Sequence, residues 1–102
     1  LRIGSPPGPT RKIRTLALCP GAGASLLRDV AADAVFTGEI KHNDALHFLR
    51  HGIHVLVSDF TGSVSPYLQV LRKRLLKALP KGVRVDVSRR DREPLTLWRD
   101  DA

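Results

Sequence analysis

The sequence predicts an α/β fold, a mostly parallel sheet with helical crossovers in the order β-α-β-α-β-α-β-β. Short apolar runs alternate along the chain with segments whose apolar residues recur at helical spacing. Glycine, proline or serine separates most of these segments, as is typical of the ends of strands and helices. Strands that alternate with helices connect by right-handed crossovers and run parallel, whereas the final pair, joined by a short charged turn, can be antiparallel.

The N-terminal region divides into an arm and the start of one domain. Residues 1–12 are predicted to be a Pro/Gly-rich arm or linker, because the first ten residues hold three prolines and two glycines. Residues 13–102 have the usual length of a single α/β domain. Its first strand is expected at 13–18, and Ser25 is a candidate cap for a short helix that ends near residue 31.

The middle of the chain predicts two strands and a helix between them. The strands are expected at 34–37, just before Gly38, and at 53–58. The helix is expected over 43–51, with Gly52 in the left-handed conformation that closes many helices. Four apolar residues occupy its inner side: Ala45, Leu46, Phe48 and Leu49.

The strongest helical pattern covers 65–79. Ser65 is the expected N-cap, and Pro66 takes the first helical position, where its missing N–H is no loss. Alternating valines then predict a half-buried strand over 83–87, and a last short strand follows at 95–98. The apolar face of the helix consists of Val64, Tyr67, Leu68, Leu71, Leu75, Ala78 and Leu79.

The composition excludes two classes of protein. The chain has 102 residues, and no run approaches the ~20 apolar residues that a membrane-spanning helix needs. Cys19 is the single cysteine, so an internal disulfide is impossible and a disulfide-stapled secreted domain is not expected. We therefore expect no membrane partner and an intracellular, reducing location, either the cytoplasm or the mitochondrial matrix.

The chain contains no methionine and starts with Leu1. An initiator methionine is normally removed only before a small residue, and leucine is not small. We therefore expect a processed chain, an engineered segment or the ordered part of a longer protein.

The positive charge is concentrated in one segment. Residues 72–92 contain nine basic and two acidic residues, which accounts for the whole formal charge of +7. Such a surface fits RNA or an acidic partner, and a purely solvated surface is the alternative. No aromatic residues interleave with the cations, so stacking on single-stranded bases is not predicted. The predicted anion- or partner-binding residues are Arg72, Lys73, Lys77, Arg84, Arg89 and Arg90.

Two weaker motifs have ordinary structural explanations beside the functional ones. The glycine-rich segment 19–25 lies between a strand and a helix, where backbone N–H groups can bind phosphate or simply form a tight turn. Asp44, His47 and His51 share one helix face and have spacing compatible with zinc. That face is also the polar side of an amphipathic helix, which is the interpretation we favour. No arrangement of nucleophile and base is evident, so no catalytic residue is predicted.

Three segments resemble one known family. Residues 37–44, Thr-Gly-Glu-Ile-Lys-His-Asn-Asp, with Leu46 two positions later, resemble the TGE-x-x-H-x-D-x-L signature of the NIF-three-like family. Its bacterial members are also called GTP cyclohydrolase I type 2 homologues. Residues 17–25 and 91–95 resemble the family's ALC-x-G-x-G-x-S and DR-[DE]-PL segments. The match corresponds to the C-terminal part of a full-length member.

The resemblance implies α/β halves, ring-shaped hexamers and a two-metal centre. A His-His pair and an Asp of that centre belong to the N-terminal half, and the C-terminal half adds His and Glu in a GH-x-x-[ST]-E motif. Here these two positions hold Phe60 and Val64, or Asp59 and Ser63 if the alignment shifts by one. Neither pair supplies His and Glu, so we expect no metal or other cofactor on this segment.

The signature nevertheless leaves a candidate site that consists of Gly38, Glu39, His42 and Asp44. Its residues lie near a strand end, where α/β sheets place ligands. Capping and charging of a helix N-terminus by the same side chains is the alternative.

These observations lead to one functional prediction and two alternatives. We expect a non-catalytic binding or assembly module within a protein or ribonucleoprotein assembly, with RNA as a possible partner and homo-oligomers implied by the resemblance. The first alternative is the C-terminal half of a metal-dependent hydrolase or GTP cyclohydrolase-like enzyme, completed by a missing N-terminal half. The second is a structural subunit whose arm, residues 1–10, docks onto a neighbour.

Overall fold

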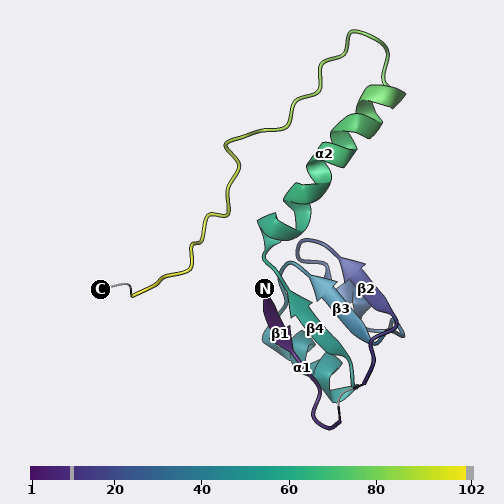
Figure 1. The fold of residues 1–102 in the computed structure, drawn as a ribbon, viewed down its shortest axis with the longest axis vertical. Helices are drawn as coiled ribbons and strands as arrows, with labels where there is room; N and C mark the ends of the chain where they lie inside the picture. Colours follow the sequence, from purple (N-terminus) through teal and green to yellow (C-terminus); the bar gives the residue numbers. More distant parts are fainter. Residues whose placement is uncertain (10, 101–102) are drawn as a thin grey trace.

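The computed structural model describes residues 1–9 and 11–100, which form a four-stranded sheet, a helix behind it and a long helix that leads away from it (Figure 1). This arrangement confirms an α/β fold with a mostly parallel sheet. The strands are β1 (Arg2–Gly4), β2 (Leu16–Cys19), β3 (Ala34–Thr37) and β4 (His54–Val57). The helices are the 3-10 helix η1 (Ala24–Leu27) and the α-helices α1 (His42–Arg50) and α2 (Phe60–Ala78).

The sheet has the strand order β1-β4-β3-β2. Strands β2, β3 and β4 are parallel, as the alternation of strands and helices predicts. Val35 of β3 lies opposite both Ala17 of β2 and Val55 of β4, so one apolar row crosses the three strands. This row faces α1 and η1 and forms the floor of the core.

Strand β1 corrects the predicted N-terminal arm. Residues 2–4 pair antiparallel with β4, with Ile3 opposite Leu56. They therefore belong to the sheet of their own chain, and are not available as a free arm for a neighbour. The glycines and prolines of 4–9 describe the turn that follows, but pairing depends on the free edge of β4, which local composition does not reveal.

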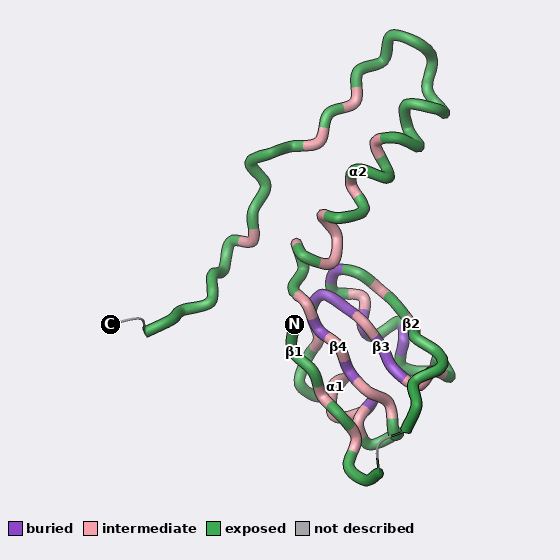
Figure 2. The backbone as a smooth tube through the Cα atoms, in the orientation of Figure 1, coloured by how far each residue is buried: buried purple, intermediate pink, exposed green. Residues whose placement is uncertain are grey.

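The core lies between the sheet and α1. Leu27, Val35, Phe48, Val55 and Val57 are buried together, and Phe48 is the largest fully buried side chain. Figure 2 shows that the buried stretches of the backbone lie in the part of the molecule that contains the sheet. The prediction that α1 turns Phe48 inward is therefore confirmed. Most of these residues come from β3, β4 and α1, so the core is confined to the sheet together with η1 and α1. We call this part of the molecule the sheet body.

Helix α1 ends as predicted at a left-handed glycine. Gly52 has φ 74°, and the N–H groups of Gly52 and Ile53 donate to the carbonyls of Leu49 and Phe48 at 3.2 and 2.9 Å. These bonds satisfy carbonyls that the last helical turn would otherwise leave free. The chain then enters β4 two residues later.

The predicted helix after Cys19 is shorter than expected. Only the four residues of η1 are helical, and its N-cap is Gly23, not Ser25. Ser25 is exposed within the 3-10 turn, and no side chain caps it. Without a side-chain acceptor for its free N–H groups, this segment makes a single turn.

Helix α2 starts at Phe60, six residues before Pro66, the predicted first helical residue. Asp59 is the N-cap, and its carboxylate accepts a hydrogen bond from the N–H of Gly62, so the predicted cap Ser65 lies inside the helix. Pro66 is also internal. The strong cap favours this earlier start, because an aspartate side chain satisfies an N–H that Ser65 cannot reach.

The two predicted C-terminal strands do not form among the described residues. The segment after α2 instead turns at Gly82 and runs back along the helix without pairing to the sheet (Figure 1). Val85 and Val87 are half-buried beside Leu71 and Leu75 of α2, and the Arg72 Nε donates to the Val85 carbonyl at 2.9 Å. Alternating valines favour an extended chain, but a strand also needs a free neighbouring edge.

No helix in the described part of the chain is long and apolar enough to cross a membrane.

Candidate functional site

The candidate site lies where the three parallel strands end. The loop after β2, the signature segment after β3 and the first turn of α2 after β4 meet at this edge of the sheet. Ligands of open α/β sheets bind at this edge, because the loops there are free to vary while the strands hold them in place. The sequence correctly predicts that the signature follows a strand.

Gly21 connects all three segments. Its carbonyl accepts hydrogen bonds from the N–H groups of Gly38 and Glu39 at 3.1 and 2.8 Å, and its own N–H donates to the Ser63 Oγ at 2.9 Å. Gly21 has φ 71°, a conformation that glycine adopts without the cost that a side chain imposes. The glycine-rich loop is therefore held by the signature segment and by α2.

A residue without a side chain is favoured at position 38, because the backbones of two other segments approach it closely. A Cβ atom at this position would lie 2.7 Å from the carbonyl oxygens of both Gly21 and Asp59, and 2.4 Å from the Ser63 Oγ. Thr37 beside it is fully buried, and its hydroxyl lies 3.4 Å from the Gly21 carbonyl. The first two residues of the signature thus have a structural explanation in the packing of the strand ends.

The acidic residues of the signature border a small hollow. Glu39 and Asp44 line a space of about 270 Å³ together with Lys41, Ser25 and neighbouring apolar atoms. Glu39 is exposed, whereas Asp44 is half-buried. The hollow therefore presents carboxylates and an ammonium group at the edge of the sheet where ligands are expected.

His42 does not join this hollow. It is the first residue of α1 and is exposed, while Lys41 is the N-cap and makes no side-chain capping bond. The structure thus brings Gly38, Glu39 and Asp44 to one edge and leaves His42 on the surface beside them. The role of these four residues as a binding site stays a prediction.

Arg28 is a partner of Asp44 that the sequence analysis missed. Its guanidinium lies 3.1 Å from the Asp44 carboxylate and 3.4 Å from the His47 Nδ1, and the Arg28 carbonyl lies 3.3 Å from the His47 Nε2. These contacts join the loop after η1 to α1. A basic residue 16 positions before Asp44 gives no local signal, because the contact depends on how the helix packs.

The zinc interpretation of this face does not fit the geometry. No three His, Cys, Asp or Glu side chains are grouped closely enough to hold a metal ion within the described ranges 1–9 and 11–100. His51 is directed to the His47 carbonyl, with its Nδ1 at 2.7 Å. Asp44, His47 and His51 serve contacts within the chain.

The positions that the resemblance assigns to the family's metal ligands lie at the start of α2. Phe60 and Val64 have no donor atom for a metal. Under the shifted alignment, Asp59 caps the helix, and Ser63 accepts from the Gly21 N–H and donates to the Phe60 carbonyl. The loss of the two-metal centre that the resemblance implies stays a prediction.

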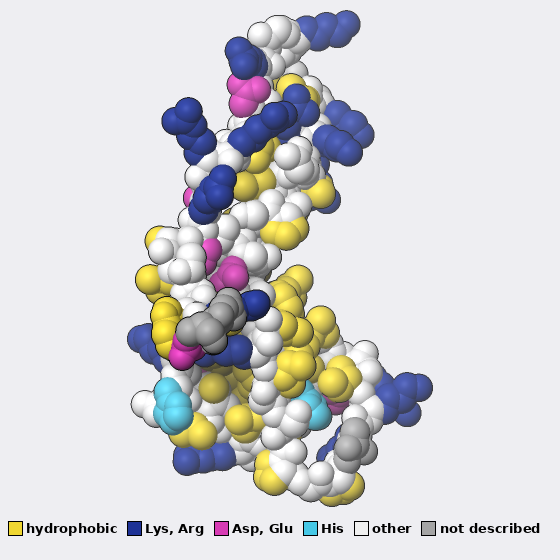
Figure 3. All heavy atoms as spheres, turned by 60° about the vertical axis from the view of Figure 1, so that its left-hand side comes forward, with side chains coloured by type: hydrophobic (Ala, Val, Ile, Leu, Met, Phe, Trp, Pro, Cys, Tyr) yellow, Lys and Arg dark blue, Asp and Glu magenta, His cyan; other side chains and the backbone are white. Residues whose placement is uncertain are grey.

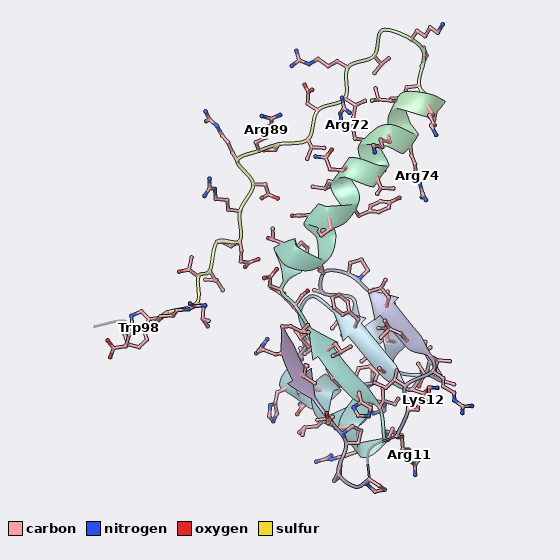
Figure 4. The ribbon with its side chains drawn as sticks, in the orientation of Figure 1. Arg11, Lys12, Arg72, Arg74, Arg89 and Trp98 are labelled. Carbon is pink, nitrogen blue, oxygen red and sulfur yellow. The ribbon has the colours of Figure 1, made fainter. Side chains whose placement is uncertain are left out.

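The basic residues lie on α2 and on the segment that returns beside it. Arg72 is half-buried and holds the returning segment through Val85, while the other five predicted cations are exposed. Figure 3 shows Lys and Arg side chains gathered over this part of the molecule, and in Figure 4 Arg89 projects from the returning segment opposite α2. Arg84 forms an ion pair with Asp86 at 2.7 Å, on a surface open to water.

Asp33 is a second charged residue that the sequence analysis missed. The backbone N–H groups of Arg14 and Thr15 donate to its carboxylate at 2.8 and 3.0 Å. These bonds favour the ionised form and hold the pKa of Asp33 below its usual value. Asp33 therefore ties the chain before β2 to the start of β3, on the side of the sheet away from the candidate site.

The family model Duf34/NIF3 (NGG1p interacting factor 3) matches residues 3–94. The chain belongs to this family. It is 38% identical over 99 residues to NIF3-like protein 1 of Dictyostelium discoideum, which is 95% of this chain and 28% of that protein. It is 34% identical over 86 residues to human NIF3-like protein 1, which is 84% of this chain and 23% of the human protein.

A yeast relative is named for an interaction. NGG1-interacting factor 3 of Saccharomyces cerevisiae is 32% identical over 88 residues, which is 84% of this chain and 30% of that protein. The chain spans about a quarter to a third of the length of these relatives. No solved structure matches it.

Proposed function

We propose that this NIF3-family domain is a non-catalytic binding module whose basic surface on α2 and residues 81–92 binds RNA or an acidic protein surface. The observation that carries the proposal is the arrangement of the cations. Lys73 and Lys77 on α2, and Arg84, Arg89 and Arg90 on the returning segment, are all exposed on two stretches of chain that the contact between Arg72 and Val85 holds together.

The electrostatics support an anionic partner. Among the residues that the structure describes, Asp86 is the one acidic residue in an ion pair with a cation of this surface, and that pair is open to water, where ion pairs contribute little. The surrounding positive charge stays unneutralised, and it attracts phosphates or carboxylates over distances of about a Debye length. A yeast relative named as an interacting factor also favours a binding role.

The start of α2 supports a role without metal chemistry. Phe60 and Val64 cannot bind a cation. The Asp59 side chain caps α2 at the Gly62 N–H, and the Ser63 hydroxyl accepts from the Gly21 N–H in the loop after β2. A metal at this position would have to take these oxygens from the backbone groups that they satisfy.

Salt-dependent binding of two probes tests the proposal. A fluorescent 20-nucleotide uridine RNA and a fluorescent polyglutamate peptide would be titrated with the chain at several salt concentrations. The variant Lys73→Gln/Lys77→Gln/Arg84→Gln removes three cations of the surface. For RNA, the slope of log affinity against log salt should fall by about 2, since each phosphate contact on a single strand contributes about 0.7.

A matched control separates the surface from the net charge. Arg11→Gln/Lys12→Gln/Arg50→Gln removes three exposed cations from the sheet body, and Figure 4 shows Arg11 and Lys12 at the opposite end of the molecule from α2. The control should retain the slope. Equal losses in both triple variants, or no binding of either probe, would contradict the proposal.

A second candidate is the C-terminal part of a metal-dependent hydrolase or GTP cyclohydrolase-like enzyme. The observation that favours it is the hollow bordered by Glu39 and Asp44 at the edge where α/β sheets bind ligands. Elemental analysis of the protein purified from the cells that express it tests this candidate. About two divalent metals per chain, reduced by Glu39→Gln, would favour the enzyme, whereas a folded protein without metal would exclude it.

A further inference from the structure

One face of the sheet carries an apolar row across all four strands. Leu18 of β2 lies opposite Phe36 of β3, which lies opposite Leu56 of β4, which lies opposite Ile3 of β1. Because side chains alternate between the two faces of a strand, these four side chains point to the face opposite the core residues Val35 and Val55. Figure 1 looks onto this face, with α1 behind the strands.

This face is uncovered. Ile3 is 64% exposed and Leu18 is 62% exposed, and the next residue of β2 on the same face, Leu16, is 54% exposed. Phe36 and Leu56 in the two central strands are half-buried. Sheets of parallel strands are normally covered on both faces, because their side chains are apolar on both sides. Among the described residues, η1 and α1 cover the other face of the sheet, and no element covers this one.

Helix α2 does not supply the second cover. It leads away from the sheet (Figure 1). Its apolar residues Leu68, Leu71 and Leu75 line a shallow hollow together with Val85 and Val87 of the returning segment. Figure 3 likewise shows hydrophobic side chains at the surface of the body that holds the sheet. The open face is therefore available to another element.

The size of the open face favours a single helix as the element that covers it. Four strands are about 19 Å wide, and four residues of a strand are about 13 Å long, so the face measures about 250 Å². Two copies of a protein that form a stable dimer bury about 800 Å² each, so face-to-face pairing of this sheet alone is too small. One helix, about 10 Å wide, covers the apolar row with two to three turns.

The relatives extend well beyond the part that matches this chain. The Dictyostelium and human proteins carry 72% and 77% of their length outside the part that matches this chain, since the match covers 28% and 23% of them. We infer that the open face binds an amphipathic helix of the same polypeptide, from outside residues 1–102. The apolar side of this helix packs on Leu18, Phe36 and Leu56, and its residues recur every three or four positions.

Photo-crosslinking tests the inference, with the protein expressed in the cells in which it occurs naturally. Benzoylphenylalanine would replace Leu18, and Leu26 would be replaced in the control. Leu26 is 77% exposed on η1, which lies at the other face of the sheet, so the two positions match in residue type and exposure. Leu16 provides a second position on the open face in case the substitution of Leu18 prevents folding.

Mass spectrometry of the cross-linked peptides gives the outcome. Positions 18 and 16 should link to one peptide of the same polypeptide, outside residues 1–102, at residues spaced by three or four, and position 26 should not. Links to residues 1–102 of a second copy, links to a different protein, or a folded protein without links from the open face would each overturn the inference. None of these results depends on the basic surface, so the proposed function is tested separately.

Discussion

The sheet body and the α2 region bury their apolar residues to very different extents. In the body, β3, β4, η1 and α1 enclose a core in which Phe48 and Val35 are completely buried. Helix α2 is longer than any element of the body, yet none of its 19 residues is buried. The radius of gyration of 17.3 Å exceeds the ~13 Å of a compact chain of this length, because α2 and the returning segment project from the body.

The difference shows which contacts stabilise this chain. The body is held by packing, which contributes in proportion to the apolar area removed from water. The α2 region is held by its N-cap, by hydrogen bonds at its first turn and by shallow contacts with the returning segment. Substitutions should therefore have large effects in the body, intermediate effects at the junction and small effects within α2.

The largest expected effect is in the core. Phe48→Ala should lower the free energy of unfolding by about 3–5 kcal/mol, because it removes a large buried side chain and leaves a cavity. Phe60→Ala is the matched control, since Phe60 is nearly half exposed at the start of α2. Chemical denaturation followed by circular dichroism measures both, and equal losses would show that the body and the α2 region do not differ in this way.

The next effect is at the junction between the body and α2. Gly38→Ala should destabilise the chain by about 1–3 kcal/mol, because the new methyl group would overlap two backbone carbonyls that cannot move independently. Gly4→Ala is the control, since its methyl group would meet the flexible end of Leu49 at 3.3 Å. Thermal unfolding of the two variants gives the comparison, and a neutral Gly38→Ala would exclude close packing of the strand ends.

A smaller effect is expected at the cap of α2. Asp59→Ala should cost about 1 kcal/mol and reduce helical circular dichroism, because the Gly62 N–H loses its acceptor. Ser65→Ala, at the position that local sequence predicts as the cap, should change the signal little, since Ser65 lies inside the helix. A greater loss for Ser65→Ala would place the start of the helix at Pro66.

The smallest effect concerns the pH dependence of the body. The folded-state pKa of Asp33 lies below its unfolded value. Its hydrogen bonds therefore stabilise the fold fully above the unfolded pKa of about 3.9. This stabilisation is lost as the pH falls through the folded-state pKa. Asp33→Asn should therefore flatten the acid limb of the stability curve. Unfolding measured between pH 2 and pH 7 tests this, with Asp29→Asn, an exposed carboxylate before the same strand, as the control.

The sheet body could largely be predicted from the sequence. Strand β3 has its predicted bounds, and α1 lies within one residue of its predicted range, because each has a clear apolar pattern and a glycine just after it. The edge strand β1 could not be predicted, since its three residues are strand-like only beside β4. Of the candidate site, the sequence could predict that Glu39 and Asp44 follow a strand end, and both border one hollow, whereas Arg28 and Ser63 reach this region through long-range contacts. The role of these residues as a site stays a prediction.

The α2 region could be predicted less completely than the sheet body. Its helical pattern is strong, and the helix is present, but its first residue, its neighbours and the state of residues 83–98 all differ from the prediction. Periodicity reports that one side of a helix is apolar, and it does not report what covers that side. The alternating valines likewise describe an extended chain that can pair only where a sheet edge is free.

The α/β class, the family, the concentration of charge in residues 72–92 and the glycines at tight turns follow from the amino-acid sequence, because these depend on local composition, spacing and motif order. The tertiary structure alone decided the pairing of β1, the start of α2 at Asp59, the contacts of Asp44 with Arg28 and the exposure of one sheet face. Each of these depends on which groups meet across many residues, where burial and hydrogen bonding outweigh the weak preferences of short segments.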